Sequence, residues 1–160
     1  MDRVILITGG TSGIGLAVAR LFLQTGSTVA LAGRSATRGE AALASLGALA
    51  LDGRAAFFAA DLRCADEARW LVNAVCERFS RIDVLVNSAG IYLERALEDL
   101  TEEEFDDVMD TNVKGVFFTT QAALAPLKAS RGNIVNLSSD AGIHGNFLCT
   151  AYCASKGAVT

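Results

Sequence analysis

Short apolar runs alternate with longer segments of helical pattern along this chain. Each run is rich in β-branched residues and is apolar on consecutive positions instead of alternating with polar ones. That pattern is typical of strands buried on both faces of a parallel sheet. We therefore predict five central strands, at Val4–Ile7, Thr28–Leu31, Ala55–Ala59, Ile82–Val86 and Asn133–Leu137.

The segments between these runs carry helix signals. Thr37 followed by Glu40, and Thr101 followed by Glu104, are capping-box patterns, and each predicts the beginning of a helix. Pro126 is expected to bend or end the helix in which it lies. Apolar residues at helical spacing mark further buried stripes at Ile14, Val18, Leu21 and Phe22, at Leu71, Val72 and Val75, and at Phe105, Val108, Val113, Val116 and Phe117.

This alternation predicts an α/β fold of the Rossmann type, a doubly wound parallel sheet with helices on both faces. The 160 residues fit one domain, 1–160, without repeat or linker. No further strand follows the fifth, although open sheets of this type usually have a sixth. We therefore expect the domain to be incomplete at its C-terminus, with an exposed apolar edge at Ile134, Val135 and Leu137.

Composition narrows the class of protein. The net charge is −4, and no cluster of Lys or Arg stands out, which disfavours nucleic acid and anionic membranes as partners. No run approaches the roughly 20 apolar residues of a membrane helix, so we expect a cytoplasmic protein. His144, Cys149 and Cys153 lie close in sequence but lack a fourth ligand, so no metal site is expected.

A glycine-rich turn joins the first strand to the first helix. It reads Gly9-Gly10-Thr11-Ser12-Gly13-Ile14-Gly15. Glycines at such a turn admit a pyrophosphate, and the helix N-terminus offers free N–H groups and partial positive charge. The spacing differs from G-x-G-x-x-G, and a plain tight turn is the alternative. We interpret it as a dinucleotide phosphate loop.

The ends of the second and third strands carry charged residues. Arg34 and Ser35 follow the second strand, where a guanidinium suits the 2′-phosphate of NADP and an acid would suit NAD. NADP (NADPH) is therefore favoured over NAD, with a solvated surface arginine as the alternative. Asp61 and Leu62 follow the third strand, where the acid either meets adenine or caps a turn.

Candidate catalytic groups lie late in the chain. Tyr152 and Lys156 are spaced i and i+4 and therefore share one helix face. An ammonium beside a phenol stabilises the phenolate and lowers the phenol pKa from its usual value of about 10, so that the tyrosine can act as a general acid–base. Ser138 and Ser139 close the fifth strand on the ligand side. Asn112 falls within an apolar stripe, where its amide either serves the site or bridges a helix to a strand. For Tyr152 and Lys156 the alternative is an ordinary solvated helix face, and for the two serines it is a turn at the end of a strand.

In order and spacing, these residues resemble the short-chain dehydrogenase/reductase family over essentially the whole chain. The resemblance implies four catalytic residues: Asn112 would anchor a proton-relaying water, Ser139 orient the substrate oxygen, Tyr152 transfer the proton, and Lys156 lower the tyrosine pKa and hold the nicotinamide ribose. Ser139 is selected over Ser138 by its place thirteen positions before the tyrosine. The implied cofactor-binding set is Gly9, Thr11, Ser12, Gly13, Ile14, Gly15, Arg34, Ser35, Asp61, Leu62, Asn87, Ala89, Gly90, Tyr152 and Lys156.

The sequence departs from the family in two places. Ser88 replaces the second asparagine of the usual Asn-Asn-Ala-Gly, which puts the support behind the nicotinamide in doubt. The chain also ends four residues after Lys156, before the family's substrate-covering part. We expect an NADP-dependent oxidoreductase that interconverts a small-molecule alcohol and carbonyl, and a homo-oligomer if a full-length form exists. The alternatives are a non-catalytic dinucleotide-binding fragment, or a fragment completed within a hetero-oligomer.

Overall fold

The computed structural model describes residues 3–160, built around one parallel five-stranded sheet in the order β3-β2-β1-β4-β5. All five predicted strands form, with small shifts at their ends, and the doubly wound α/β fold is confirmed. The strands are β1 (Val4–Thr8), β2 (Thr28–Gly33), β3 (Ala55–Ala59), β4 (Val84–Asn87) and β5 (Asn133–Asn136). Alternate residues of β1 enter opposite cores, Ile5 and Ile7 on one face and Val4 and Leu6 on the other.

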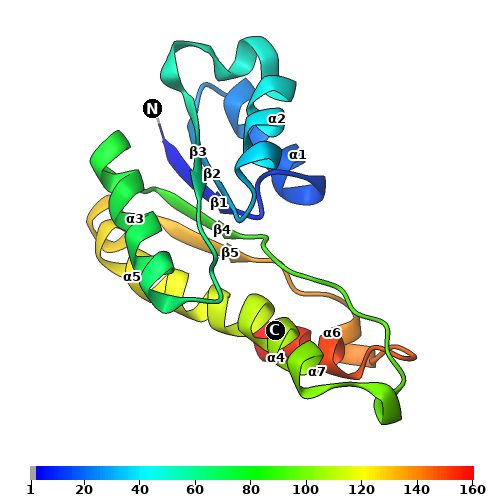
Figure 1. Cartoon of the computed structure of the whole chain (residues 1–160). Coiled ribbons are helices and arrows are strands. Elements are labelled where there is room, and N and C mark those ends of the chain that lie inside the picture. The colour runs from blue at the N-terminus through cyan, green and yellow to red at the C-terminus, as the bar shows by residue number, and fades with distance from the viewer. Residues whose placement is uncertain (1–2) are drawn as a thin grey trace.

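Two helix layers cover the sheet (Figure 1). Helices α1 (Gly13–Gln24) and α2 (Ala36–Leu46) pack on the Ile5 face, and the irregular turns of η1 (Gly47–Gly53) lead from α2 to β3. Helices α3 (Ala65–Phe79) and α5 (Gly115–Ser130) pack on the opposite face. In α3 the predicted stripe is buried, because Leu71, Val72 and Val75 all face this core.

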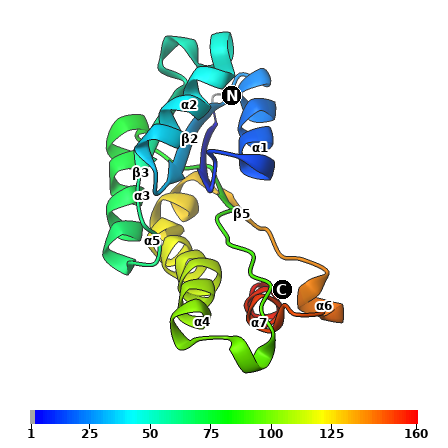
Figure 2. The same ribbon diagram turned by 45° about the vertical axis from the view of Figure 1, so that its right-hand side comes forward.

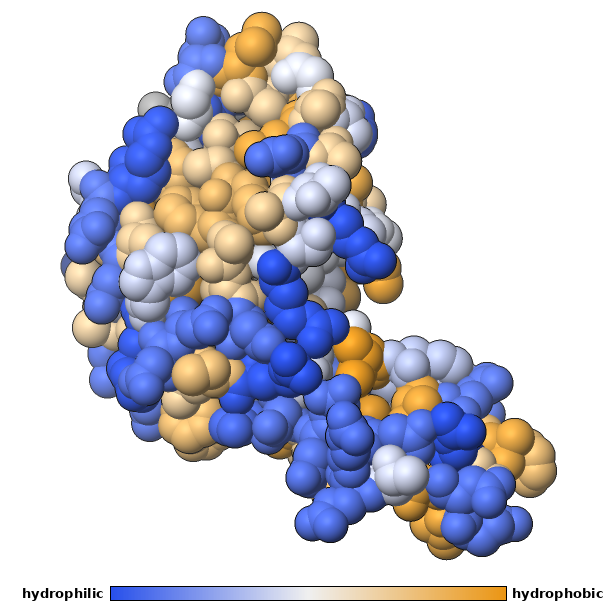
Figure 3. Space-filling view, in the orientation of Figure 1, coloured by the Kyte–Doolittle hydropathy of each residue, from blue (hydrophilic) through white to orange (hydrophobic). Residues whose placement is uncertain are grey.

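The two outer strands are not buried on both faces, so the prediction of five central strands is wrong for β3 and β5. An edge strand has one neighbour, and residues of β3 are mostly half-buried while those of β5 are mostly exposed. Of the expected apolar edge, Val135 is 48% exposed, whereas Ile134 and Leu137 are half-buried against the core. In Figure 3 apolar surface also gathers between α2 and α3, where the β3 edge faces the viewer.

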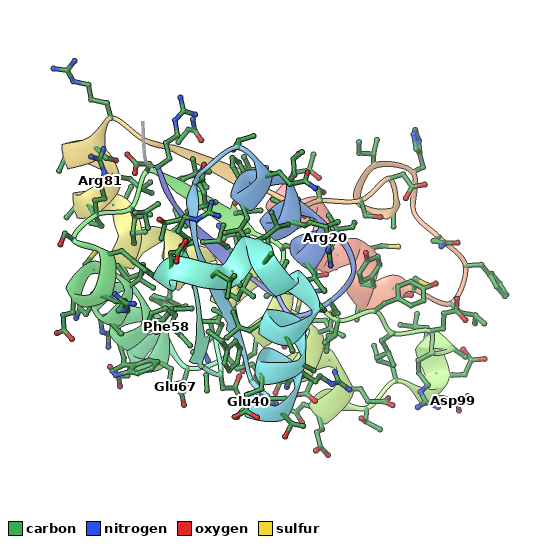
Figure 4. The ribbon with its side chains drawn as sticks, turned by 90° about the horizontal axis from the view of Figure 1, so that it is seen from above. Arg20, Glu40, Phe58, Glu67, Arg81 and Asp99 are labelled. Carbon is green, nitrogen blue, oxygen red and sulfur yellow. The ribbon has the colours of Figure 1, made fainter. Side chains whose placement is uncertain are left out.

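The remaining elements lie beyond the carboxyl ends of the strands. Figure 2 shows α4 (Glu102–Met109), α6 (Ala141–His144) and α7 (Thr150–Val159) together, away from α1 and α2. The turn η2 (Leu97–Asp99) belongs to the same end. In Figure 4, Arg81 before β4 and Asp99 after it lie at opposite ends of the molecule. A π-helical segment, η3 (Asp110–Lys114), joins α4 to α5, and α7 packs against α4, α6 and η3.

Several predicted helix details are wrong. Helix α2 begins at Ala36 with Ser35 as its N-cap, whose hydroxyl accepts the Arg38 N–H, so Thr37 caps nothing. Of the two effects expected of Pro126, ending the helix does not occur, since α5 continues to Ser130 and Leu127 beyond the proline packs into the core.

Two predicted stripes are also wrong in part. In α1 the stripe is only partly correct: Val18 and Phe22 are half-buried against the core, whereas Ile14 and Leu21 are exposed. The fully buried residues of α1 are Gly15, Ala19 and Leu23. Across η3, Phe105 and Phe117 are exposed, and Val113 and Val116 are half-buried, although Val108 is buried as predicted. A π turn shifts the phase of the helix, so one 3.6-residue period cannot describe both sides of it.

Candidate active site

A cavity of about 500 Å³ opens at the carboxyl ends of the strands, as expected for an open α/β sheet. Its wall is formed by the turn after β1, the ends of β2 and β3, the segment after β4, and α7. Most of the predicted site residues line it: Gly9, Thr11, Ser12, Gly13, Ile14, Arg34, Ser35, Asp61, Leu62, Ala89, Gly90, Tyr152 and Lys156. Gly15, Asn87, Asn112 and Ser139 do not belong to its wall.

The glycine turn forms a cradle open to the cavity. A Cβ on Gly9 would lie 2.7 Å from the Ala89 Cα, and a Cβ on Gly15 would lie 2.5 Å from the Gly9 carbonyl oxygen. Gly13 has a positive φ of +49° and meets open space. Because the side chain of the N-cap Ser12 does not bond the first N–H groups of α1, those groups are free for a ligand. The turn therefore fits a phosphate group at a helix N-terminus.

Positive charge lies beside the glycine turn, where a Cβ on Gly33 would be 3.2 Å from the Thr11 side chain. Arg34 and Arg38 line the cavity here, with the Ser35 hydroxyl between them at the beginning of α2. The nearby carboxylate of Asp61 is engaged by Arg63, whose Nε donates to both its oxygens at 3.0 Å. These hydrogen bonds hold the pKa of Asp61 below its usual value. The residues at this end thus fit the phosphorylated ribose of NADP.

Hydrogen bonds from neighbouring elements fix the end of β4 and the segment that follows it. Asn87 is buried, and its Nδ2 donates to Thr120 Oγ1 at 3.0 Å and to Asn136 Oδ1 at 2.9 Å, which ties β4 to α5 and β5. The hydroxyl of Thr8 accepts the backbone N–H groups of Ser88 and Ala89, both at 3.2 Å. The backbone of Ser88 is therefore fixed from β1 without the side chain usual in the family.

Tyr152 and Lys156 lie on one face of α7, as the spacing predicts. The Lys156 ammonium is 5.8 Å from the centre of the Tyr152 ring and donates to the Leu137 carbonyl at 2.7 Å. Burial lowers the pKa of Lys156. The Tyr152 ring also meets the ring of Tyr92 edge-to-face, with centroids 4.9 Å apart. The Tyr152 ring thus contacts both an ammonium and an aromatic ring at the cavity wall.

Asn112 lies inside η3 and is buried. Its Oδ1 accepts the Ile91 N–H at 2.8 Å, and its Nδ2 donates to the Ile91 carbonyl at 3.0 Å. These two bonds are the bridge from a helix to the chain after a strand that the sequence left open as an alternative. A Cβ on Gly90 would lie 3.2 Å from Asn112 Oδ1 and 3.7 Å from Lys156 Nζ, so glycine keeps the space between the two side chains open.

The two serines after β5 lie differently from each other. Ser138 lines the cavity, and its hydroxyl donates to the Lys156 carbonyl at 3.0 Å. The Ser139 hydroxyl donates to the Asp140 carboxylate at 3.0 Å and accepts the Ala141 N–H at 3.2 Å, at the beginning of α6. The structure therefore does not bring Ser139, which the resemblance selects, to the wall formed by Tyr152 and Lys156.

Sequence reasoning missed several polar residues of this region. Tyr92, Arg63 and Thr111 line the cavity, and Ser155 is buried beside Asn112. Tyr92 and Arg63 follow strands, and that position is the signal that could have found them. Ser155 stands between two residues already singled out in α7, but nothing in the sequence indicates its contact with Asn112.

A second hollow, of about 630 Å³, lies between the beginning of α3 and α4. Carboxylates dominate its lining, among them Glu67, Glu102 and Asp106, and they disfavour a phosphorylated ligand there. Within the part of the chain that the structure describes, no three His, Cys, Asp or Glu side chains gather as metal ligands would. No helix among residues 3–160 has the length and apolar character needed to cross a membrane.

Known proteins are similar to this chain in sequence. The model of the family described as short chain dehydrogenase matches residues 3–160. An NADP-dependent (R)-specific alcohol dehydrogenase from Lentilactobacillus kefiri is 39% identical, over 98% of this chain and 62% of that protein. A monensin polyketide synthase putative ketoacyl reductase from Streptomyces virginiae is 42% identical, over 99% of this chain and 61% of that protein.

Solved structures agree with this grouping. A variant of actinorhodin polyketide ketoreductase with NADPH matches with a TM-score of 0.92 and 37% identity, over 99% of this chain and 61% of that one. The chain thus spans 61–62% of the length of these relatives.

Proposed function

The chain belongs to the short-chain dehydrogenase family, and from that premise we propose that it is an NADP-dependent oxidoreductase that interconverts an alcohol and a carbonyl. The observation that carries the proposal is one continuous cavity with two chemically different ends. A glycine cradle with Arg34 and Arg38 forms one end, and Tyr152 with Lys156 forms the other. The first end suits a phosphorylated nucleotide, and the second suits proton transfer to an oxygen.

The cofactor assignment has support from relatives as well as from Arg34. The alcohol dehydrogenase from Lentilactobacillus kefiri is NADP-dependent by name, and the ketoreductase structure was determined with NADPH. Bound NADPH supplies the hydride in the direction of carbonyl reduction. The chain's own residues bind the phosphates at the cradle, and Arg34 binds the 2′-phosphate through its planar donors.

The proton in this account comes from Tyr152. Its phenol oxygen donates the proton to the substrate oxygen, and in the reverse direction accepts it from an alcohol. The Lys156 ammonium favours the phenolate that remains. Asn112 and Ser139 would serve as the resemblance implies, by anchoring a water and by orienting the substrate oxygen. The homo-oligomeric state and cytoplasmic location stay predictions of the sequence.

A second candidate is a non-catalytic dinucleotide-binding module. The observation that favours it is the Ser139 hydroxyl, which bonds Asp140 and lies outside the cavity wall. Such a module binds NADPH without consuming it, so turnover separates the two candidates.

The variant Tyr152→Phe tests the proposed function. It removes only the phenol oxygen, so we expect kcat for carbonyl reduction to fall by a factor of about 10²–10⁴ while the Kd for NADPH changes little. Tyr92→Phe makes the same change on the neighbouring ring and should keep turnover far above that of Tyr152→Phe. Equal activity of Tyr152→Phe and wild type would refute the assigned role.

A further inference from the structure

Ser155 is fully buried in α7, between Tyr152 and Lys156. Its hydroxyl donates to the Tyr152 carbonyl at 2.7 Å and accepts a hydrogen from Asn112 Nδ2 at 3.0 Å. The first bond is an ordinary local contact of a helical serine. The second joins α7 to η3, a different element forty-three residues earlier in the chain.

This contact completes the hydrogen bonding of the Asn112 amide group. One Nδ2 hydrogen goes to the Ile91 carbonyl and the other to Ser155, while Oδ1 accepts the Ile91 N–H. An amide nitrogen has two hydrogens to give, so both are used. The only remaining capacity of the amide is a second lone pair on Oδ1, an atom that would lie 3.2 Å from a Cβ on Gly90.

A chain of hydrogen bonds therefore runs from the backbone of Ile91 through Asn112 and Ser155 to the Tyr152 carbonyl. It connects the wall after β4 with the helix that carries both Tyr152 and Lys156. Burying a hydroxyl costs free energy unless it forms hydrogen bonds. A position on this face that served packing alone could be alanine, which is the residue found one turn earlier at the buried position 151.

We propose that Ser155 is a positioning residue that holds α7 in register with Asn112 and so fixes Tyr152 and Lys156 relative to the cavity wall at Gly90 and Ile91. Ser155 does not line the cavity and acts through Asn112. This proposal rests on the proposed function for its kinetic consequence, but the hydrogen-bonded link itself does not depend on turnover.

The test compares Ser155→Ala with Asn112→Ala and with the double variant. We expect Ser155→Ala to lower kcat about tenfold, with the Kd for NADPH nearly unchanged, because one buried Asn112 donor loses its acceptor. In the Asn112→Ala background the same change should cost little more, because its effect has no route. Ser155→Cys keeps the size with a weaker hydrogen-bonding group and should lie between.

Ser130→Ala is the matched control. Ser130 donates to the Ile82 carbonyl at 2.7 Å, at the end of α5 and outside the cavity lining, so this variant should retain wild-type kcat. Losses that multiply fully in the double variant, or wild-type kcat for Ser155→Ala in an active protein, would overturn the proposal.

A second readout requires no turnover. The Ile91 N–H donates to Asn112, so its hydrogen exchange should become faster in Ser155→Ala and stay unchanged in Ser130→Ala. Unchanged Ile91 exchange in Ser155→Ala would overturn the link even if the protein consumes no NADPH. Absence of turnover in the wild type together with faster Ile91 exchange would instead reject the proposed function and support the link.

Discussion

Whether Arg34 is available to bind a phosphate depends on how the nearby carboxylate of Asp61 is paired. Asp61, at the end of the adjacent strand, would compete for the guanidinium if its carboxylate were free. Arg63 already donates to both Asp61 oxygens and also to Asp107 on α4. The pair Asp61–Arg63 therefore leaves Arg34 available to a phosphate, and no feature of the sequence at Arg34 indicates this.

Replacing Arg34 by alanine should separate the two nicotinamide cofactors. We expect Arg34→Ala to weaken NADPH binding about 10- to 100-fold, as loss of a charge-assisted hydrogen bond would, and to change NADH binding little. Isothermal titration with both cofactors measures this. Arg20→Ala, whose guanidinium bonds the Ser45 carbonyl and lies outside the cavity lining, is the control. Equal weakening of both cofactors would remove the 2′-phosphate argument.

Lys156 predicts a particular dependence of stability on pH. Burial lowers its pKa in the folded protein below the ordinary 10.5, so between those two values the unfolded chain binds the extra proton. The contribution of Lys156 to stability therefore rises with pH through that window and is least favourable below it. The free energy of unfolding of Lys156→Met, minus that of wild type, should decrease from neutral pH toward 10.5 in urea titrations.

The control for this series is Lys128→Met, which removes a charge from an exposed position on α5. A difference between Lys156→Met and wild type that is independent of pH would contradict the burial of the ammonium.

At the scale of elements, two identical sequence signals had different outcomes. Thr101 and Glu104 form a complete capping box at the beginning of α4, with both reciprocal bonds at 3.2 Å. Thr37 and Glu40 do not, because Ser35 caps α2 first. A local motif states that a helix begins nearby, and competition between adjacent hydroxyls decides where.

This difference gives a paired stability test. Thr101→Ala should lower the free energy of unfolding by about 1 kcal/mol, whereas Thr37→Ala should stay within about 0.5 kcal/mol of wild type. Both positions are exposed, so neither change leaves a cavity. Denaturant titration checks the pair, and equal losses at the two positions would show that the capping geometry is not the cause.

Strands were predictable because burial on both faces produces short runs of consecutive apolar residues, and most helices because burial of one side produces a period of 3.6 residues. The signal failed at η3, where the π turn changes the phase between Val108 and Phe117. It failed also in α1, where contact with the glycine turn favours small buried residues such as Gly15 and Ala19 over the larger Ile14. Residues of the cavity wall were predictable where they follow a strand end, as Arg34 does. The Asp61 carboxylate accepts the Arg63 backbone N–H, which is the turn-capping alternative left open by the sequence. The contact of Ser155 with Asn112 joins distant elements and was not predictable.

At the scale of the whole molecule, the sheet order explains why the site lies where it does. β1 and β4 are neighbours at the centre, so the turn after β1 and the segment after β4 meet, and Thr8 binds Ser88 across them. The arm formed by α4, α6 and α7 then places Tyr152 and Lys156 on the same cavity (Figure 2). The residues proposed to bind the cofactor and those proposed to transfer the proton thereby line one cavity, although they lie more than a hundred residues apart in sequence.

The most direct test of this account is a titration of the purified protein with NADPH and with NADH, followed by turnover with a panel of carbonyl substrates. We predict that NADPH binds more tightly than NADH and that a carbonyl substrate causes loss of the reduced nicotinamide's absorbance. Binding without loss of absorbance would instead favour the non-catalytic module. Failure of both cofactors to bind the folded protein would contradict the claim that this cavity is a dinucleotide-binding site.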